Sequence, residues 1–291
     1  MFVNHWHVAP EGTFRGKNPA QGTLAEVRET MHKLNIGRAL VFAPFMHCMP
    51  NDIWYNIPLK DERECNEWLY KSLKEYPEME GFVTVNPLNP DACEIVSEYI
   101  GKGFRGIKIH PAVFQVQVDD TACSQYYSTI QDLGVPLLIH TGSHGWMPEK
   151  YRPLRLGKVA RKYPRLKIII EHTGGTDYFE EALEVLKNNP NCYAGITSTF
   201  IRIVQGGITN TSYLTPERLL KLIKTIGARK MIYGTDYPFN KLEDTKYELD
   251  FIRSLEISNW EREYILGKTL KSLLDAKNIC STKQIEFAIS M

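Results

Sequence analysis

Residues 135–142 (VPLLIHTG) and residues 167–175 (KIIIEHTGG) decide the fold, because each is a short apolar run that ends on His-Thr-Gly. A short apolar run bounded by turn residues is typical of a buried strand in a parallel sheet. Between the two runs, the spacing of apolar residues over Leu154–Tyr163 predicts a helix. Strand, helix and strand in this order form the β-α unit of a parallel sheet.

The same alternation continues along the whole chain. Strands are expected at Met1–Asn4, Ala39–Phe42, Gly81–Val85, Gly106–Ile109, Val135–Ile139, Lys167–Glu171, Cys192–Ile196 and Met231–Tyr233. Helices are expected at about Leu24–Leu34, Glu62–Glu75, Asp91–Gly101, Ala122–Leu133, Leu154–Tyr163, Phe179–Lys187, Pro216–Ile226, Leu242–Leu255 and Trp260–Leu274. Eight strands, each followed by a helix, favour a closed (β/α)8 barrel, the TIM barrel, over an open doubly wound sheet. No linker divides the chain, so we expect one barrel domain over residues 1–291.

Composition excludes several classes of protein. Lys plus Arg is 35 against 34 for Asp plus Glu, and like charges do not cluster, so we expect no nucleic-acid or membrane partner and a small-molecule substrate. The first residues lack a secretory signal, which predicts a cytoplasmic protein. The six cysteines form no Cys-x-x-Cys pair, so free thiols are expected rather than a zinc ribbon or a disulfide framework.

Histidines gather at the ends of the expected strands. Five of the eight lie there, namely His5, His7, His110, His140 and His172, and Asp236 follows the eighth strand in the same way. In a (β/α)8 barrel the carboxyl ends of all strands meet at one rim, where the active site is built. Any one of these residues alone could equally be a packed strand-end side chain. Their joint occurrence predicts a metal site.

The first two histidines are spaced so that both can bind one metal ion. Residues i and i+2 of an extended chain point to one side, so His5 and His7 can approach the same ion. With His140 and Asp236 they would supply nitrogen and oxygen ligands that suit one zinc or a similar divalent ion. His172 would then accept a proton from bound water, whose pKa falls to about 7 on zinc.

Five motifs together resemble the amidohydrolase superfamily, in its amidohydrolase-related (amidohydrolase 2) branch of metal-dependent TIM-barrel hydrolases and decarboxylases. They are His5-Trp6-His7 and the segments 106–111 (GIKIHP), 136–142 (PLLIHTG), 169–175 (IIEHTGG) and 233–238 (YGTDYP). The resemblance extends from the first strand to about Leu274. It implies a single metal bound by His5, His7, His140 and Asp236, with His172 activating the water and Asp236 also able to move a proton.

The resemblance also points to substrate-binding residues. Lys108 matches a fourth-strand lysine that is carbamylated in two-metal relatives. His110-Pro111 after it is typical of the single-metal branch. Membership of that branch implies that the amine of Lys108 is free and that Lys108 and His110 lie near the substrate. Arg152 and Arg202 could each hold a substrate carboxylate, although a solvated surface arginine is the alternative for both. The chain departs from the family pattern at Asn4, where relatives usually carry an acidic residue or another strand residue before the first metal ligand.

Three functions follow from these predictions. The first is hydrolysis of a C–O or C–N bond in a lactone, ester or amide through a metal-activated water. The second is non-oxidative decarboxylation of a small carboxylic acid, known in the same branch. The third is a catalytically silent barrel, which the presence of all five site residues disfavours. The habit of the family implies a homodimer.

Overall fold

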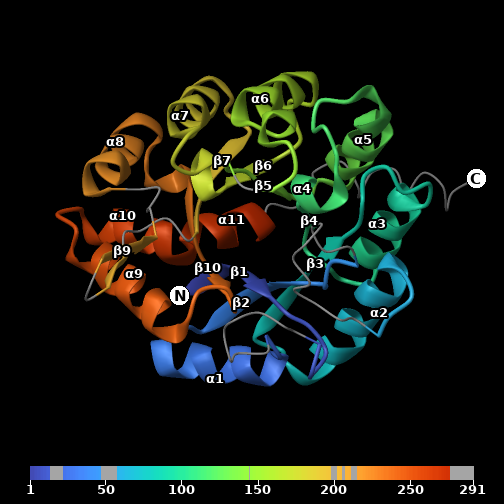
Figure 1. Cartoon of the computed structure of the whole chain (residues 1–291), viewed down its shortest axis with the longest axis horizontal. Helices are drawn as coiled ribbons and strands as arrows, with labels where there is room; N and C mark the ends of the chain where they lie inside the picture. Colours follow the sequence, from blue (N-terminus) through green and yellow to red (C-terminus); the bar gives the residue numbers. More distant parts are fainter. Residues whose placement is uncertain are drawn as a thin grey trace, which may run out of the picture.

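Eight parallel strands close into a barrel in the computed structural model of the chain (Figure 1). The structure describes residues 1–13, 22–46, 58–143, 145–197, 202–204, 207–210 and 215–275, and for residues 202–210 it describes the backbone alone. The barrel strands are β1 (Phe2–His7), β2 (Arg38–Phe42), β3 (Met79–Thr84), β4 (Ile107–Ile109), β5 (Leu137–His140), β6 (Ile168–Glu171), β7 (Cys192–Thr197) and β10 (Met231–Tyr237). They pair in the order β1-β10-β7-β6-β5-β4-β3-β2, so β10 closes the barrel against β1. The predicted (β/α)8 fold is confirmed.

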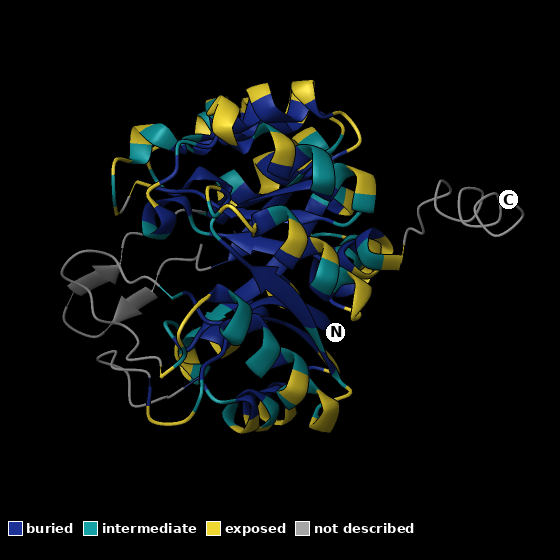
Figure 2. Ribbon diagram, turned by 90° about the vertical axis from the view of Figure 1, so that its right-hand side faces the viewer, coloured by how far each residue is buried: buried dark blue, intermediate teal, exposed yellow. Residues whose placement is uncertain are grey.

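The helices lie around the outside of the barrel, apart from the last one, which covers one end of it (Figure 1). They are α1 (Leu24–Leu34), α2 (Glu62–Ser72), α3 (Ala92–Gly101), α4 (Pro111–Phe114), α5 (Ser124–Leu133), α6 (Pro153–Lys162), α7 (Phe179–Asn188), α8 (Pro216–Ile226), α9 (Leu242–Ser254), α10 (Asn259–Glu263) and α11 (Thr269–Asp275). Figure 2 shows exposed residues on the outward faces of the helices and buried residues along the strands. Within the described ranges, every helix falls short of the length and apolarity that a membrane span requires.

The structure differs from the sequence prediction at several strand ends. β1 continues past Asn4 to His7, and β10 continues past Tyr233 to Tyr237, so the predicted ligands lie inside these strands rather than after them. An antiparallel hairpin of β8 (Arg202–Val204) and β9 (Gly207–Asn210) was not predicted. Its strands have 3 and 4 residues, which is too short for apolar periodicity to reveal them.

Helix α11 closes the end of the barrel where the strands begin. Its side chains Leu270 and Leu273 join a cluster of inward-facing strand residues that includes Phe2, Leu138 and Ile169. Two cations that precede strands bind its last carbonyls: Arg105 Nη2 donates to Leu274 O at 2.9 Å, and Lys167 Nζ donates to Leu273 O at 3.4 Å. The opposite end, where the strands finish, is therefore left for the site.

We expect Leu270→Ala to lower the free energy of unfolding by about 2–5 kcal/mol, because it leaves a cavity in a closed core. Leu270 is fully buried, whereas Leu220 on α8 is 42% exposed, so Leu220→Ala is the matched control and should change the value by less than about 0.5 kcal/mol. Urea unfolding of both variants checks this. Equal losses in the two variants would contradict the packing of α11 in the barrel.

The cysteines in the described part of the chain are free thiols. Cys65, Cys123 and Cys192 are buried and Cys93 is half-buried. Burial raises the pKa of each of the three buried thiols to about 12, which keeps them protonated and unreactive. Cys48 and Cys280 lie outside the described residues.

Candidate metal centre

The closure of the barrel brings the first and the last strand together. β1 pairs with β10, with Asn4 opposite Gly234. As a result, Asp236 Oδ1 lies 3.3 Å from His5 Nε2 and 3.2 Å from His7 Nε2. Ligand atoms of His5, His172 and Asp236 also lie within 4.8 Å of one another. Residues that are far apart in sequence therefore share one small buried volume.

Three of these residues have a backbone conformation that side chains rarely adopt. The φ angles of His5, His172 and Asp236 are 67°, 60° and 61°, in the left-handed region. Such a residue costs on the order of 1–3 kcal/mol and persists only where its surroundings hold it. Here the Thr235 hydroxyl donates to His5 O at 3.0 Å and so ties β10 to the strained turn of β1.

The strain explains how the two histidines of β1 converge. The register of β1 against β2 shifts between Val3 and Trp6, where Asn4 and His5 lie opposite the single residue Leu40, which places a bulge at His5. The two imidazoles meet Asp236 through this bulge rather than through the regular extended geometry that the sequence predicts. Trp6 between them is fully buried and packs on Tyr237, with ring centroids 5.6 Å apart.

The protonation states suit a metal. Burial, together with the charge of Lys108, holds the pKa of His5 well below its usual value. Burial lowers the pKa of His7 as well, although Asp236 opposes this. For Asp236, burial acts to raise the pKa, but the hydrogen bond of His7 and the nearby histidines outweigh it and hold the pKa well below its usual value. Neutral imidazole and ionised carboxylate are the forms that bind divalent ions.

The spacing also fits. Zinc–nitrogen bonds of about 2.0–2.1 Å in a tetrahedral site place neighbouring ligand atoms about 3.4 Å apart. The two histidine-to-Asp236 distances of 3.3 and 3.2 Å are close to this value. These two distances are compatible with an ion beside Asp236, while the three residues whose ligand atoms all lie within 4.8 Å of one another are His5, His172 and Asp236.

Comparison with known proteins identifies the family. The family model described as "Amidohydrolase" matches residues 55–269, which is most of the chain. The chain belongs to the amidohydrolase family.

Individual relatives of this amidohydrolase are distant. A dihydroorotase of Helicobacter hepaticus is 33% identical over 97 residues, and the match spans 31% of this chain but only 27% of that enzyme. A dihydroxybenzoic acid decarboxylase from Polaromonas sp. JS666, solved with bound manganese and the inhibitor 2-nitroresorcinol, has a TM-score of 0.66 at 16% identity, covering 94% of this chain and 96% of its own. A candidate 2-pyrone-4,6-dicarboxylic acid hydrolase from Pseudomonas putida has a TM-score of 0.66 at 15% identity, with the same coverage of 94% and 96%. At these identities the solved structures show a shared fold.

The remaining histidines of the amidohydrolase rim form a stack. His110 and His140 lie face to face with ring centroids 3.8 Å apart and an interplanar angle of 13°. The ring of His140 meets His172 edge-on, with centroids 4.6 Å apart. His140 therefore borders the group of His5, His172 and Asp236, and its role as a ligand stays a prediction.

Lys108 lies inside the site. Its side chain is fully buried, and its Nζ is 3.3 Å from His5 Nε2 and 5.2 Å from the centre of the Phe42 ring. Burial lowers the pKa of Lys108 to about 8, although Glu171 and Asp236 act in the opposite direction. This position places its amine beside His5, one of the predicted metal ligands.

The structure describes the side chain of only one of the two arginines predicted to bind substrate. Arg152 Nε donates to Glu181 on α7 at 2.9 Å, and its guanidinium lies 5.3 Å from the centre of the Tyr178 ring. The side chain of Arg202 lies outside the described residues. A role in substrate binding stays a prediction for both.

Sequence reasoning missed one buried residue of the site, Glu171. Its side chain is fully buried at the end of β6 and lies 2.9 Å from His5 Nδ1, through its Oε2 atom. The signal was available, because a carboxylate at the end of the apolar run Ile168–Ile170 has no place in a hydrophobic core. The departure at Asn4 belongs to the same contact, since Asn4 Nδ2 donates to Glu171 Oε2 at 2.8 Å.

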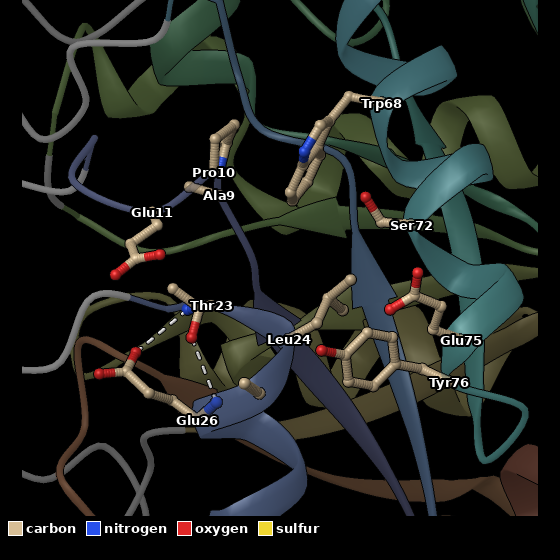
Figure 3. Close-up of a pocket in the computed structure, with 11 residues that line it drawn as sticks. Ala9, Pro10, Glu11, Thr23, Leu24, Glu26, Trp68, Ser72, Glu75 and Tyr76 are labelled. Carbon is tan, nitrogen blue, oxygen red and sulfur yellow. Dashed lines mark hydrogen bonds between the residues drawn. The ribbon is translucent and has the colours of Figure 1, made fainter.

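A separate cavity of about 500 Å³ lies between the loop after β1, the start of α1 and helix α2. Figure 3 shows Trp68, Pro10 and Leu24 around it, together with the hydrogen bonds by which Thr23 and Glu26 cap α1. None of the predicted metal ligands lines this cavity. The site follows from the chemistry of the strand ends rather than from the size of this cavity.

Proposed function

We propose that this amidohydrolase is a metal-dependent hydrolase that cleaves a C–O or C–N bond in a small lactone, ester or amide. The observation that carries the proposal is the convergence of His5 and His7 on Asp236 Oδ1, at 3.3 and 3.2 Å, with His172 in the same group. His5, His7, His140 and Asp236 would hold the ion. Three nitrogen donors and one carboxylate favour a single zinc, while the manganese in the Polaromonas relative makes manganese the main competitor.

A divalent ion at this position supplies Lewis acidity, which polarises a substrate carbonyl and makes water more acidic. The chain supplies the base. His172 Nδ1 lies 2.9 Å from Thr197 O, and because a carbonyl can only accept, Nδ1 carries the hydrogen and Nε2 keeps its lone pair. His172 Nε2 takes the proton of the attacking water, and the same nitrogen then donates it to the leaving oxygen or nitrogen as the bond breaks.

Lys108 favours a second candidate function, decarboxylation of a small carboxylic acid. A decarboxylase needs a cation that holds the substrate carboxylate near the metal, and the buried Nζ of Lys108 lies 3.3 Å from His5 Nε2. Arg152 weighs against an arginine in this role, because Glu181 already binds its guanidinium. We rank hydrolysis first because the contact of His172 Nδ1 with Thr197 O leaves Nε2 to act as the base that attack by water requires.

Purified protein loaded with zinc or manganese, assayed on panels of lactones, esters, amides and aromatic acids, distinguishes the two functions. We expect acid release from a lactone, ester or amide without CO2, loss of that activity in a chelator, and recovery when the metal returns. Release of CO2 without net hydrolysis would support the decarboxylase. Absence of metal by elemental analysis, with stability unchanged by a chelator, would support a silent barrel.

A further inference from the structure

We propose that Glu171 is a positioning residue that orients His5 and thereby sets the affinity of the site for its metal. The inference rests on the proposed metal-dependent function and assigns a role to a carboxyl group that is not itself expected to touch the ion. Glu171 is fully buried at the end of β6, and β6 is not a neighbour of β1 in the barrel. Its side chain therefore reaches across the barrel interior to the strand that carries His5.

Nitrogen groups of three residues surround the two oxygens of Glu171. Oε2 lies 2.9 Å from His5 Nδ1 and accepts from Asn4 Nδ2 at 2.8 Å. Oε1 accepts from the backbone nitrogen of His172 at 3.2 Å. The one side chain thus contacts β1, which carries His5 and His7, and the backbone of His172, which is the arrangement expected of a group that aligns ligands.

Gly195 on β7 makes room for this side chain. A Cβ atom at Gly195 would lie 2.3 Å from Glu171 Oε1 and 2.6 Å from its carboxyl carbon, which no real structure tolerates. The backbone of Gly195 is itself fixed, because Thr173 Oγ1 donates to its carbonyl oxygen at 2.9 Å. The absence of a side chain at residue 195 therefore defines the position of the carboxyl group.

The contact decides which nitrogen of His5 faces the metal. Glu171 Oε2 lies 2.9 Å from His5 Nδ1 without the alignment of a hydrogen bond, so the contact is electrostatic. A hydrogen on Nδ1 is favoured beside this carboxylate, and it leaves the lone pair of Nε2 for an ion next to Asp236, whose Oδ1 is 3.3 Å away. Phe42 packs edge-on against the same ring at 5.0 Å and limits its rotation. Without the carboxylate, the ring would lose the partner that selects this tautomer. Partners of this kind contribute roughly 10–100-fold to metal affinity.

The test is Glu171→Gln, with zinc affinity measured by competition against a chromophoric chelator. We expect affinity to fall about 10–100-fold, with the far-ultraviolet circular dichroism unchanged. Glu248→Gln is the matched control, because Glu248 is also buried but accepts from Tyr233 OH at 3.0 Å, away from the histidines. It should bind zinc as the original chain does. Gly195→Ala should resemble Glu171→Gln, since the added methyl group displaces the carboxyl group.

A second measurement keeps the inference testable if Glu171→Gln fails to fold. Nitrogen-15 NMR of the metal-free original chain should show His5 with its hydrogen on Nδ1, and a hydrogen on Nε2 would overturn the inference. Unchanged zinc affinity in a folded Glu171→Gln variant would overturn it too, while leaving the proposed function in place. If the original chain takes up no metal, the proposed function fails, and the tautomer of His5 still decides whether Glu171 positions it.

Discussion

Replacing Asp236 by alanine is expected to empty the metal centre and abolish activity. Its Oδ1 atom is the one that both His5 and His7 approach, and it provides the negative charge among otherwise neutral ligands. Removing it should lower metal affinity by more than the roughly 10–100-fold that outer partners contribute. Elemental analysis of the purified variant and the hydrolase assay measure the two losses.

A companion variant separates loss of a ligand from backbone strain. Alanine tolerates the φ angle of 61° at Asp236 poorly, whereas asparagine is enriched in that region, so Asp236→Asn keeps the backbone and weakens the ligand. Asp250→Ala, an exposed carboxylate that pairs with Arg253, serves as the control and should keep metal and activity. We expect His140→Ala to lose metal as well. Full metal occupancy in Asp236→Ala would show that the proposed coordination is wrong.

Replacing His172 by alanine is expected to lower kcat by about 10²–10⁴-fold while most of the metal remains. The hydrogen bond from its Nδ1 to Thr197 O prepares Nε2 to accept a proton, and the ion keeps its other ligands. Metal content and kcat must therefore be measured on the same sample. His172→Asn tests the same loss with a residue that tolerates the φ angle of 60°.

The result also decides the role of His172 in coordination. His172 lies in the same 4.8 Å group as His5 and Asp236, so a loss of metal in His172→Ala would make it a ligand rather than a base. The exposed His32 on α1 offers a control, and His32→Ala should change neither metal content nor kcat. Activity retained in His172→Ala would contradict both roles.

The fold was predictable because the pattern of buried residues controls both the helical spacing of apolar residues and the short apolar runs of the strands. The helices α1 and α8 have the predicted bounds Leu24–Leu34 and Pro216–Ile226, since apolar spacing and a side-chain cap at Thr23 or Thr215 fix them. The barrel strands, buried on both faces, appear as short apolar runs. The ends of β1 and β10 were predicted too early because they consist of polar residues. The spacing of apolar residues cannot show that a histidine or an aspartate is buried among hydrogen-bonding partners.

The sequence predicted which residues meet at the site better than it predicted their geometry. Once eight strands close, topology brings His5, His7 and Asp236 to one rim, whatever the details of each strand. The bulge at His5 and the left-handed backbone depend on contacts between distant strands, and no local pattern carries them. The sequence does show Glu171 as a carboxylate at the end of an apolar run, but it does not show its partner Asn4, which is 167 residues away.

The pairing of β1 with β10 has a consequence for biosynthesis. His5 is synthesised some 230 residues before Thr235 and Asp236, which hold and complete its surroundings. A nascent chain therefore exposes two histidines without their carboxylate until the last strand emerges. An ion held by residues of both strands would stabilise the closed barrel by about 4 kcal/mol when its concentration is 1,000 times Kd. It would therefore favour the closed barrel over a chain whose last barrel strand is not yet in place.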